Sequence, residues 1–257
     1  MINRRVLVLA AGLGAGMAGV AQAEDRPVDW GGSYAGFNGG YAFGSASSDG
    51  GASNGPSGSF WNPLDVPVVA ATARRDISPE GFNAGIEGGH NFQMGHWVPG
   101  IDLGFGYFHT QDSFTSDHIY ATNHAETVHL AANLDTDWLL TVRPKIGYAF
   151  DRYLVDVSAG LAVTQMTIRQ SFADPANSQF ESASKTMVVP GLALGAGLHY
   201  AITDAWSFKG EYLFTHFSSP QVVGNLHSAA GVVNNSQVNQ AYAENEHVFR
   251  VGIDYRF

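Results

Sequence analysis

Ten charged residues stand at alternate positions among apolar and aromatic residues of this chain. The acidic ones are Glu87, Asp102, Asp156, Glu211 and Asp254, and the basic ones are Arg143, Lys145, Lys209, Arg250 and Arg256. Side chains at alternate positions of a strand share one face. Because the two signs balance, the favoured interpretation is a network of ion pairs that fills a narrow interior. The alternative is a narrow solute path with selective charges.

A second group of residues could bind a metal ion or the iron of haemin. It comprises His109, His118, His124 and His129, with Asp112, Asp117 and Glu126 interspersed. Imidazole and carboxylate are ligands for zinc and for haem iron. The spacing matches no metal motif, so we interpret the segment as a solvated polar loop and expect no cofactor. A metal or haemin site is the alternative.

A third pattern, His216-Phe-Ser218, places a base next to a serine, as nucleophilic catalysis requires. The spacing is similar to the His/Ser pair of outer-membrane lipid A deacylases. Ser219 stands where that family has Asn, and no acidic residue can be identified that would orient the histidine. We therefore predict that the protein is not an enzyme and keep a deacylase as a remote alternative.

These residues lie in segments that alternate between apolar and polar. At the C-terminus, Phe249, Val251, Ile253, Tyr255 and Phe257 share one face, with polar residues or glycine between them. Tyr255 and Phe257 resemble the signal that the outer-membrane insertion machinery reads. With 31 Gly and 12% aromatic residues, the composition is typical of a transmembrane barrel, in which half of each strand faces a polar interior.

The alternation predicts an all-β fold, an eight-stranded antiparallel transmembrane β-barrel with short periplasmic turns and four long extracellular loops. The expected strands are 30–44, 80–92, a third ending at 109, 137–150, 153–164, 186–200, 205–217 and 247–257. The expected long loops are 45–79, 110–136, 165–185 and 218–246. An even number of strands with short turns on one side places both termini in the periplasm.

The N-terminus predicts export. Arg4 and Arg5 precede the apolar segment 6–20, and Ala21-Gln22-Ala23 is a small-x-small cleavage site. We expect a signal peptide at 1–23 and one barrel domain at 24–257. No second run of about 20 apolar residues could form a transmembrane helix. The formal net charge of −10 argues against nucleic acid as a partner.

The segments Trp30–Tyr41, Trp206–Phe214 and Phe249–Phe257 resemble strands of the OmpA-like outer-membrane β-barrel family, the small immunogenic surface proteins of alpha-proteobacteria. The resemblance implies a protein of the cell outer membrane that supports envelope integrity and presents loops for contact with a host or a small ligand. Its partners would be outer-membrane lipid, lipopolysaccharide and the insertion machinery. Some relatives are described as small porins or haemin binders, so these functions are the alternatives.

Overall fold

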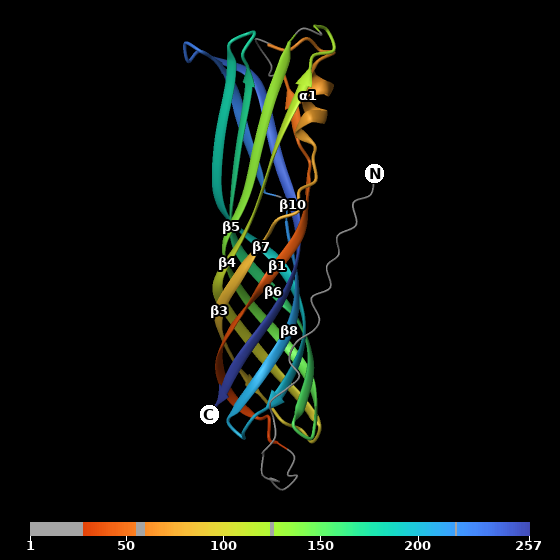
Figure 1. The fold of residues 1–257 in the computed structure, drawn as a ribbon, viewed down its shortest axis with the longest axis vertical. Helices are drawn as coiled ribbons and strands as arrows, with labels where there is room; N and C mark the ends of the chain where they lie inside the picture. The colour runs from red at the N-terminus through yellow and green to blue at the C-terminus, as the bar shows by residue number, and fades with distance from the viewer. Residues whose placement is uncertain (1–27, 55–59, 124–125, 219) are drawn as a thin grey trace, which may run out of the picture.

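The chain forms a closed ring of antiparallel strands that extends into a long cylinder (Figure 1). The computed structural model describes residues 28–54, 60–123, 126–218 and 220–257. The expected signal peptide and His124 therefore lie outside the described residues. Ten strands and one helix are present in the described part. No helix in those ranges has the length and hydropathy needed to cross a membrane.

Eight of the strands make the ring. They are β1 (Gly32–Ser48), β3 (Glu80–Asn91), β4 (Trp97–Ile119), β5 (Thr127–Phe150), β6 (Tyr153–Asp174), β7 (Gln179–Ala201), β8 (Trp206–Phe217) and β10 (Val233–Arg256). Each pairs with the next in this order, and β10 pairs with β1. Two shorter strands, β2 (Gly51–Ser53) and β9 (Gln221–Ser228), also pair with β10. Closure of the ring pairs its strand edges, as a hydrocarbon environment requires.

In the part of the cylinder next to the short turns, large apolar side chains point outward. Phe37 is 70% exposed, whereas the adjacent Asn38 is buried. The residues beside Phe37 on neighbouring strands, Ile86 and Ile253, are exposed as well. We call this outward surface the apolar belt. It includes Phe37, Phe82, Ile86, Leu103, Phe105, Val157, Leu161, Leu192, Leu198, Phe208, Phe249, Val251 and Ile253.

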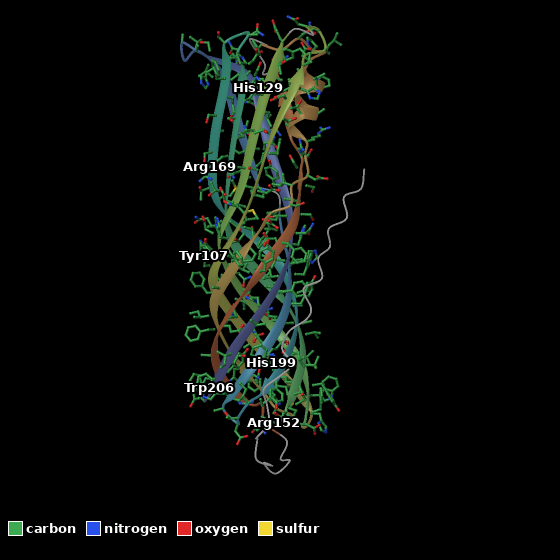
Figure 2. All side chains as sticks on the ribbon, in the orientation of Figure 1. Tyr107, His129, Arg152, Arg169, His199 and Trp206 are labelled. Atoms are coloured by element: carbon green, nitrogen blue, oxygen red, sulfur yellow. The ribbon has the colours of Figure 1, made fainter. Side chains whose placement is uncertain are left out.

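Aromatic residues mark the edge of the belt at the short turns. The ring of Tyr153 lies 5.1 Å from that of Tyr200, and the ring of Trp206 lies 4.9 Å from that of Tyr255. Phe257 packs edge-on against Tyr255 and is 75% exposed. Trp206 and Arg152 both lie at this end in Figure 2. Such amphipathic rings are typical of a membrane–water interface. The role of Tyr255 and Phe257 as an insertion signal stays a prediction.

The strands continue beyond the belt into a second region that we call the extension, the upper part of Figure 1. Here the prediction of long loops was wrong for most of their length. β4 and β5 pair as far as Ile119 and Thr127, and β6 and β7 pair as far as Asp174 and Gln179. Much of 218–246 is likewise β9 and the outer part of β10. In the segment 45–79, the structure has β2 and the helix α1 (Val66–Ala73).

The loops were mispredicted because the apolar face changes side between the belt and the extension. On β6, Val157 and Leu161 point outward in the belt, but Ile168 and Phe172 point inward in the extension. On β5 the apolar phase of the sequence stays the same. An irregularity in pairing between Thr136 and Leu139 turns the strand over instead. On β6 the outward apolar pattern therefore stops where the strand passes from belt to extension, and on β5 the pattern continues but gives no sign that the strand has turned over.

A hydrophobic core fills the extension. We call it the extension core, and it is formed by Ala46, Trp61, Val69, Ala73, Ile77, Phe114, Tyr120, Val128, Leu130, Ala132, Leu134, Ile168, Phe172, Val222, Leu226, Val238 and Tyr242. The helix α1 contributes Val69 and Ala73 to it. Polar residues such as Arg169 and His129 lie on the outside of this region (Figure 2). The extension is thus arranged as in a water-soluble protein, with its apolar side chains inside.

The two regions should respond differently to a charge on the outer surface. We predict that Val157→Lys, in the belt, lowers the free energy of unfolding in lipid by about 2–4 kcal/mol, because the charge must enter hydrocarbon. Val223→Lys, at an exposed position of β9 in the extension, should change it by less than about 0.5 kcal/mol. Unfolding by denaturant from lipid vesicles measures both values. Equal losses would contradict the assignment of the belt.

Candidate functional site: the interior of the barrel

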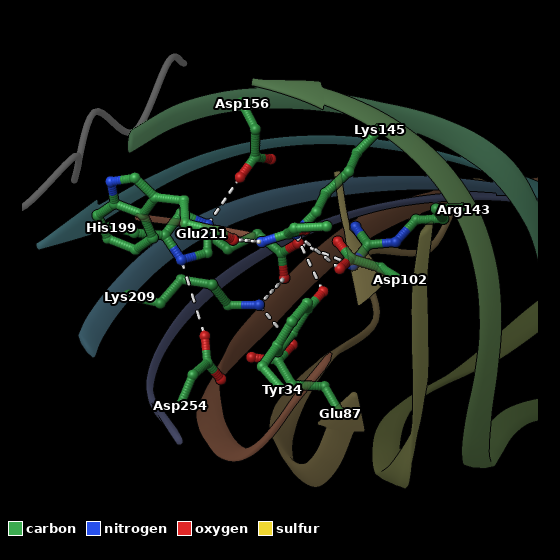
Figure 3. Close-up of polar contacts among 12 residues, drawn as sticks. Tyr34, Glu87, Asp102, Arg143, Lys145, Asp156, His199, Lys209, Glu211 and Asp254 are labelled. Carbon is green, nitrogen blue, oxygen red and sulfur yellow. Dashed lines mark hydrogen bonds and ion pairs between the residues drawn. The ribbon is translucent and has the colours of Figure 1, made fainter. Parts of the chain in front are cut away.

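The interior at the level of the belt contains the charged residues that alternation placed on the inward face. Nine of them are at most 8% exposed, namely Glu87, Asp102, Arg143, Lys145, Asp156, Lys209, Glu211, Arg250 and Asp254. Arg256 lies at the rim instead, where its guanidinium donates to the carbonyl of Asp204 and covers the ring of Trp30. We call the nine buried residues, together with Tyr34 and His199, the lumen network; Figure 3 labels all of its members except Arg250.

Glu211 is the centre of this network because three cations approach its carboxylate. Nη2 of Arg143 lies 2.8 Å from Oε1, Arg250 donates to Oε2, and Nζ of Lys209 lies 3.8 Å from Oε2. These cations come from β5, β10 and β8. The absence of a side chain at Gly195 makes room for Arg143, since a Cβ there would lie 2.6 Å from its Nη1.

The other carboxylates of the lumen network also have cationic partners. Nζ of Lys145 lies 3.0 Å from Oδ1 of Asp102 and donates to the hydroxyl of Tyr34 at 3.0 Å. Lys209 contacts Glu87 as well as Glu211. Buried charges are tolerated when they are paired and hydrogen-bonded. The geometry is therefore one of compensated pairs, with no ring of like charge among the described residues.

Two members of the network were not singled out from the sequence as charge partners. Nε2 of His199 lies 2.7 Å from Oδ2 of Asp156, and its Nδ1 lies 3.7 Å from Oδ2 of Asp254. His199 stands between the outward Leu198 and Tyr200, so alternation could have placed it inside. Tyr34 was placed on the inward face, but its contact with Lys145 joins β1 to β5 and depends on the curvature of the barrel.

Apolar side chains close the interior on both sides of the network. The middle cluster, toward the extension, comprises Ala42, Phe108, Leu139, Ala162, Met166, Val189, Ala193, Leu213, Phe217 and Val248. The lower cluster, at the short turns, comprises Val28, Trp30, Val98, Ala149, Leu154 and Ala201. A void between Trp30, Lys145 and His199 measures about 10 Å³, the lower limit for one water molecule. Sequence reasoning missed both clusters, because it assigned a polar face to the whole interior.

Three of the histidines expected in a polar loop, His109, His118 and His129, lie on strands β4 and β5. Nδ1 of His109 lies 3.1 Å from the carbonyl oxygen of Thr136, and Nδ1 of His129 lies 2.7 Å from Oδ1 of Asp117. His118 is exposed on β4. In the part of the chain that the structure describes, no three His, Asp or Glu side chains form a group suited to a metal. The loop interpretation was wrong for His109, His118 and His129, which lie in strands, whereas His124 lies outside the described residues.

His216 and Ser218 make separate hydrogen bonds. Nδ1 of His216 lies 2.7 Å from Oδ1 of Asn245, and the Ser218 hydroxyl donates to the carbonyl of Pro190 at 3.3 Å. The base and the hydroxyl that nucleophilic attack would need are thus each bonded elsewhere.

Buried polar contacts hold the segment around Trp61 in the extension core. The indole N–H of Trp61 donates to the hydroxyl of Tyr120 at 3.2 Å, and that hydroxyl donates to Oδ2 of Asp174 at 2.7 Å. Burial and this carboxylate raise the pKa of Tyr120 above its ordinary value. Burial also raises the pKa of Glu181 to about 7, although Gln170 donates to its carboxylate. The core is therefore tied together by hydrogen bonds as well as by packing.

A closed antiparallel ring with an apolar outer belt and a polar inner network defines an outer-membrane β-barrel protein. Residues 7–257 match the family described as "Outer membrane protein beta-barrel domain". The chain is 31% identical to the 31 kDa outer-membrane immunogenic protein of Brucella melitensis, over 90% of this chain and 86% of that protein. It is 25% identical to the 25 kDa outer-membrane immunogenic protein of the same organism, over 77% and 73% of the two chains.

The chain therefore belongs to the outer membrane protein beta-barrel domain family, and its location is the cell outer membrane. Among solved structures, the outer membrane protease OmpT from Escherichia coli aligns with 88% of this chain and 97% of its own, at 9% identity and a TM-score of 0.46. Ail, the attachment invasion locus protein of Yersinia pestis, aligns with 86% and 99%, at 15% identity and a TM-score of 0.30.

Removal of the central carboxylate should destabilise the barrel. We predict that Glu211→Gln lowers the free energy of unfolding by about 3–5 kcal/mol, because Arg143 and Arg250 then lose a buried counter-charge. Asp76→Asn, at an exposed position just before β3, is the control and should stay within about 0.5 kcal/mol of the wild type. Denaturant titration followed by tryptophan fluorescence measures both. An unchanged value for Glu211→Gln would show that the network is dispensable.

Proposed function

We propose that the protein is a non-conducting, non-enzymatic surface protein that supports the integrity of the cell envelope. The barrel anchors it in the outer membrane, and the extension presents a folded surface to the exterior. The observation that carries this proposal is the filled interior. The lower cluster, the lumen network, the middle cluster and the extension core follow one another along the axis.

The alternative of a small porin finds less support. A conducting path would have to pass the middle cluster, in which Phe108 and Phe217 are each at most 1% exposed. Apolar constrictions prevent conduction by excluding water. The cations that could select an anion, Arg143 and Arg250, are occupied by Glu211. These contacts favour the interpretation of the charges as ion pairs that make the barrel rigid.

Haemin binding and lipid A deacylation also find less support. His109 and His129 have other partners and occupy different strands. His216 and Ser218 do not bond to each other. The relatives from Brucella are named immunogenic outer-membrane proteins and carry no enzyme name, which fits a protein whose role is structural.

The proposed orientation places the extension outside the cell and the short turns, with the C-terminus, in the periplasm. The reason is that the polar outer surface of the extension requires water, whereas outer-membrane barrels have short periplasmic turns. On this proposal, lipopolysaccharide and other outer-membrane lipids contact the belt, and a host molecule or small ligand would meet the outer end. The insertion machinery would recognise Tyr255 and Phe257.

Electrical recording tests whether the interior is closed. We predict that purified protein in planar lipid bilayers gives no steady conductance steps, because the middle cluster excludes water. Arg143→Ala should be equally silent, since the barrier lies elsewhere. A known porin recorded in the same bilayer provides the positive control. Regular steps whose size changes in Arg143→Ala would establish a small channel and refute the proposal.

Epitope accessibility tests the orientation. We predict that an epitope inserted at the turn containing Gly231, at the outer end of the extension, is bound by antibody on intact cells. The same epitope at the short turn of Asp151 should be bound only after the outer membrane is permeabilised. Both turns are tight, so each insertion changes little of the sheet. The reverse pattern would invert the proposed orientation.

A further inference from the structure

Two carboxyl groups are enclosed between apolar layers inside the barrel and have no counter-charge. Glu244 and Glu246 point inward from β10, and each is 0% exposed. The next inward residue on one side, Tyr242, belongs to the extension core, and the next on the other side, Val248, belongs to the middle cluster. The pair therefore lies at the junction of the two apolar regions.

The oxygen atoms of this pair are only partly satisfied. Oε1 of Glu246 accepts a hydrogen bond from the hydroxyl of Thr110 at 2.6 Å. Within the described residues, Oε2 of Glu246 and both carboxyl oxygens of Glu244 have no hydrogen-bond partner outside the pair. The two carboxyl groups lie within hydrogen-bonding reach of each other, so they could share either a proton or a cation. Thr215 pairs with Glu246 in the ladder between β8 and β10, so both side chains lie on the inward face. Its hydroxyl is also completely buried and has no partner.

No protein cation neutralises the pair. The ion pairs found among the described residues include neither Glu244 nor Glu246, whereas the buried carboxylates of the lumen network have a Lys, Arg or His partner. An ionised carboxylate in such surroundings is strongly unfavourable unless a cation lies beside it. The pair must therefore take up protons or bind a cation from outside the chain.

We propose that Glu244 and Glu246, with the hydroxyl of Thr215, bind one divalent cation of the calcium class inside the barrel. Two carboxylates match its charge, and carboxyl and hydroxyl oxygens are the ligands that hard cations prefer. One shared proton would join only two carboxyl oxygens and would leave the buried hydroxyl of Thr215 without a partner, whereas a cation would take ligands from both carboxylates and from the hydroxyl. The site needs no third acidic residue, so it is consistent with the absence of larger acidic groups among the described residues.

The site would connect strands at the place where the apolar face changes side. The carboxylates belong to β10, Thr215 belongs to β8, and the hydrogen bond of Thr110 adds β4. Because both carboxylates are fully buried, the cation would enter during folding and leave only when the extension opens. We therefore expect slow exchange and a contribution to stability that free chelator in solution does not quickly remove.

Metal content and thermal unfolding test the proposal. Purified protein is unfolded, refolded in detergent with either calcium or EDTA, and then freed of unbound metal by gel filtration. Elemental analysis should find about one calcium ion per chain after refolding with calcium. The midpoint of unfolding, measured with free calcium restored to about 100 times its dissociation constant, should be higher by roughly 5–10 °C than that of protein refolded and heated with EDTA.

Variants distinguish this site from cations bound at the surface. Glu244→Gln combined with Glu246→Gln should abolish the bound calcium and the difference between the two midpoints, and Thr215→Val should weaken both. Glu181→Gln, at another buried acidic position of the extension, is the matched control and should retain both. The double variant could fail to refold. In that case the test of whether calcium binds inside the barrel rests on the comparison of the wild type with Thr215→Val and Glu181→Gln.

Two results would contradict the calcium site. Wild-type protein that binds no calcium, with the same midpoint after refolding with calcium and with EDTA, would overturn the proposal and show that protons neutralise the pair. Calcium bound equally by the wild type and the double variant would also overturn it, because the ion would then lie elsewhere.

Discussion

The change of surroundings along the strands, from lipid to water, is the constraint on which the rest of this structure depends. Apolar side chains must face an apolar medium. In the belt that medium is the hydrocarbon outside the ring, so Val157 and Phe249 point outward and polar residues are left inside. In the extension the outside is polar, so Ile168 and Phe172 point inward. One continuous sheet can satisfy both conditions only if its apolar face changes side.

This constraint accounts for the charges of the interior. Residues that face inward in the belt cannot contact the lipid, and eight strands leave only enough space for side chains. Polar groups in that space must bond to each other, as Arg143, Glu211 and Arg250 do. Apolar layers above and below exclude water from the network, which makes each ion pair depend more strongly on its partner.

The regular alternation of outward apolar and inward polar residues fails where the belt meets the extension. β5 changes its register against β6 between Thr136 and Leu139, and the inward face at this level carries Thr215, Glu244 and Glu246. A polar layer between two apolar ones is costly unless its groups are bonded. Departures from simple patterning of this kind are most often found at functional or strained positions. The carboxyl pair is therefore the part of the interior that needs a proton or a cation from outside the chain.

The sequence by itself determined which residues share a face. Period-two alternation was enough to predict the antiparallel ring, the short turns near Gly95, Asp151 and Thr203, and the inward position of the nine lumen charges. It could not reveal what medium each face meets, so the strands of the extension were taken for loops and the histidines were placed in a solvated polar loop. Only the tertiary structure decided that Arg143 meets Glu211, that His199 meets Asp156, and that Glu244 and Glu246 meet no cation. The contact of Arg143 with Glu211 joins β5 to β8 across the interior, and that of His199 with Asp156 joins the neighbouring strands β7 and β6. These contacts are fixed by register and by closure of the ring, and alternation within a single strand carries no information about either.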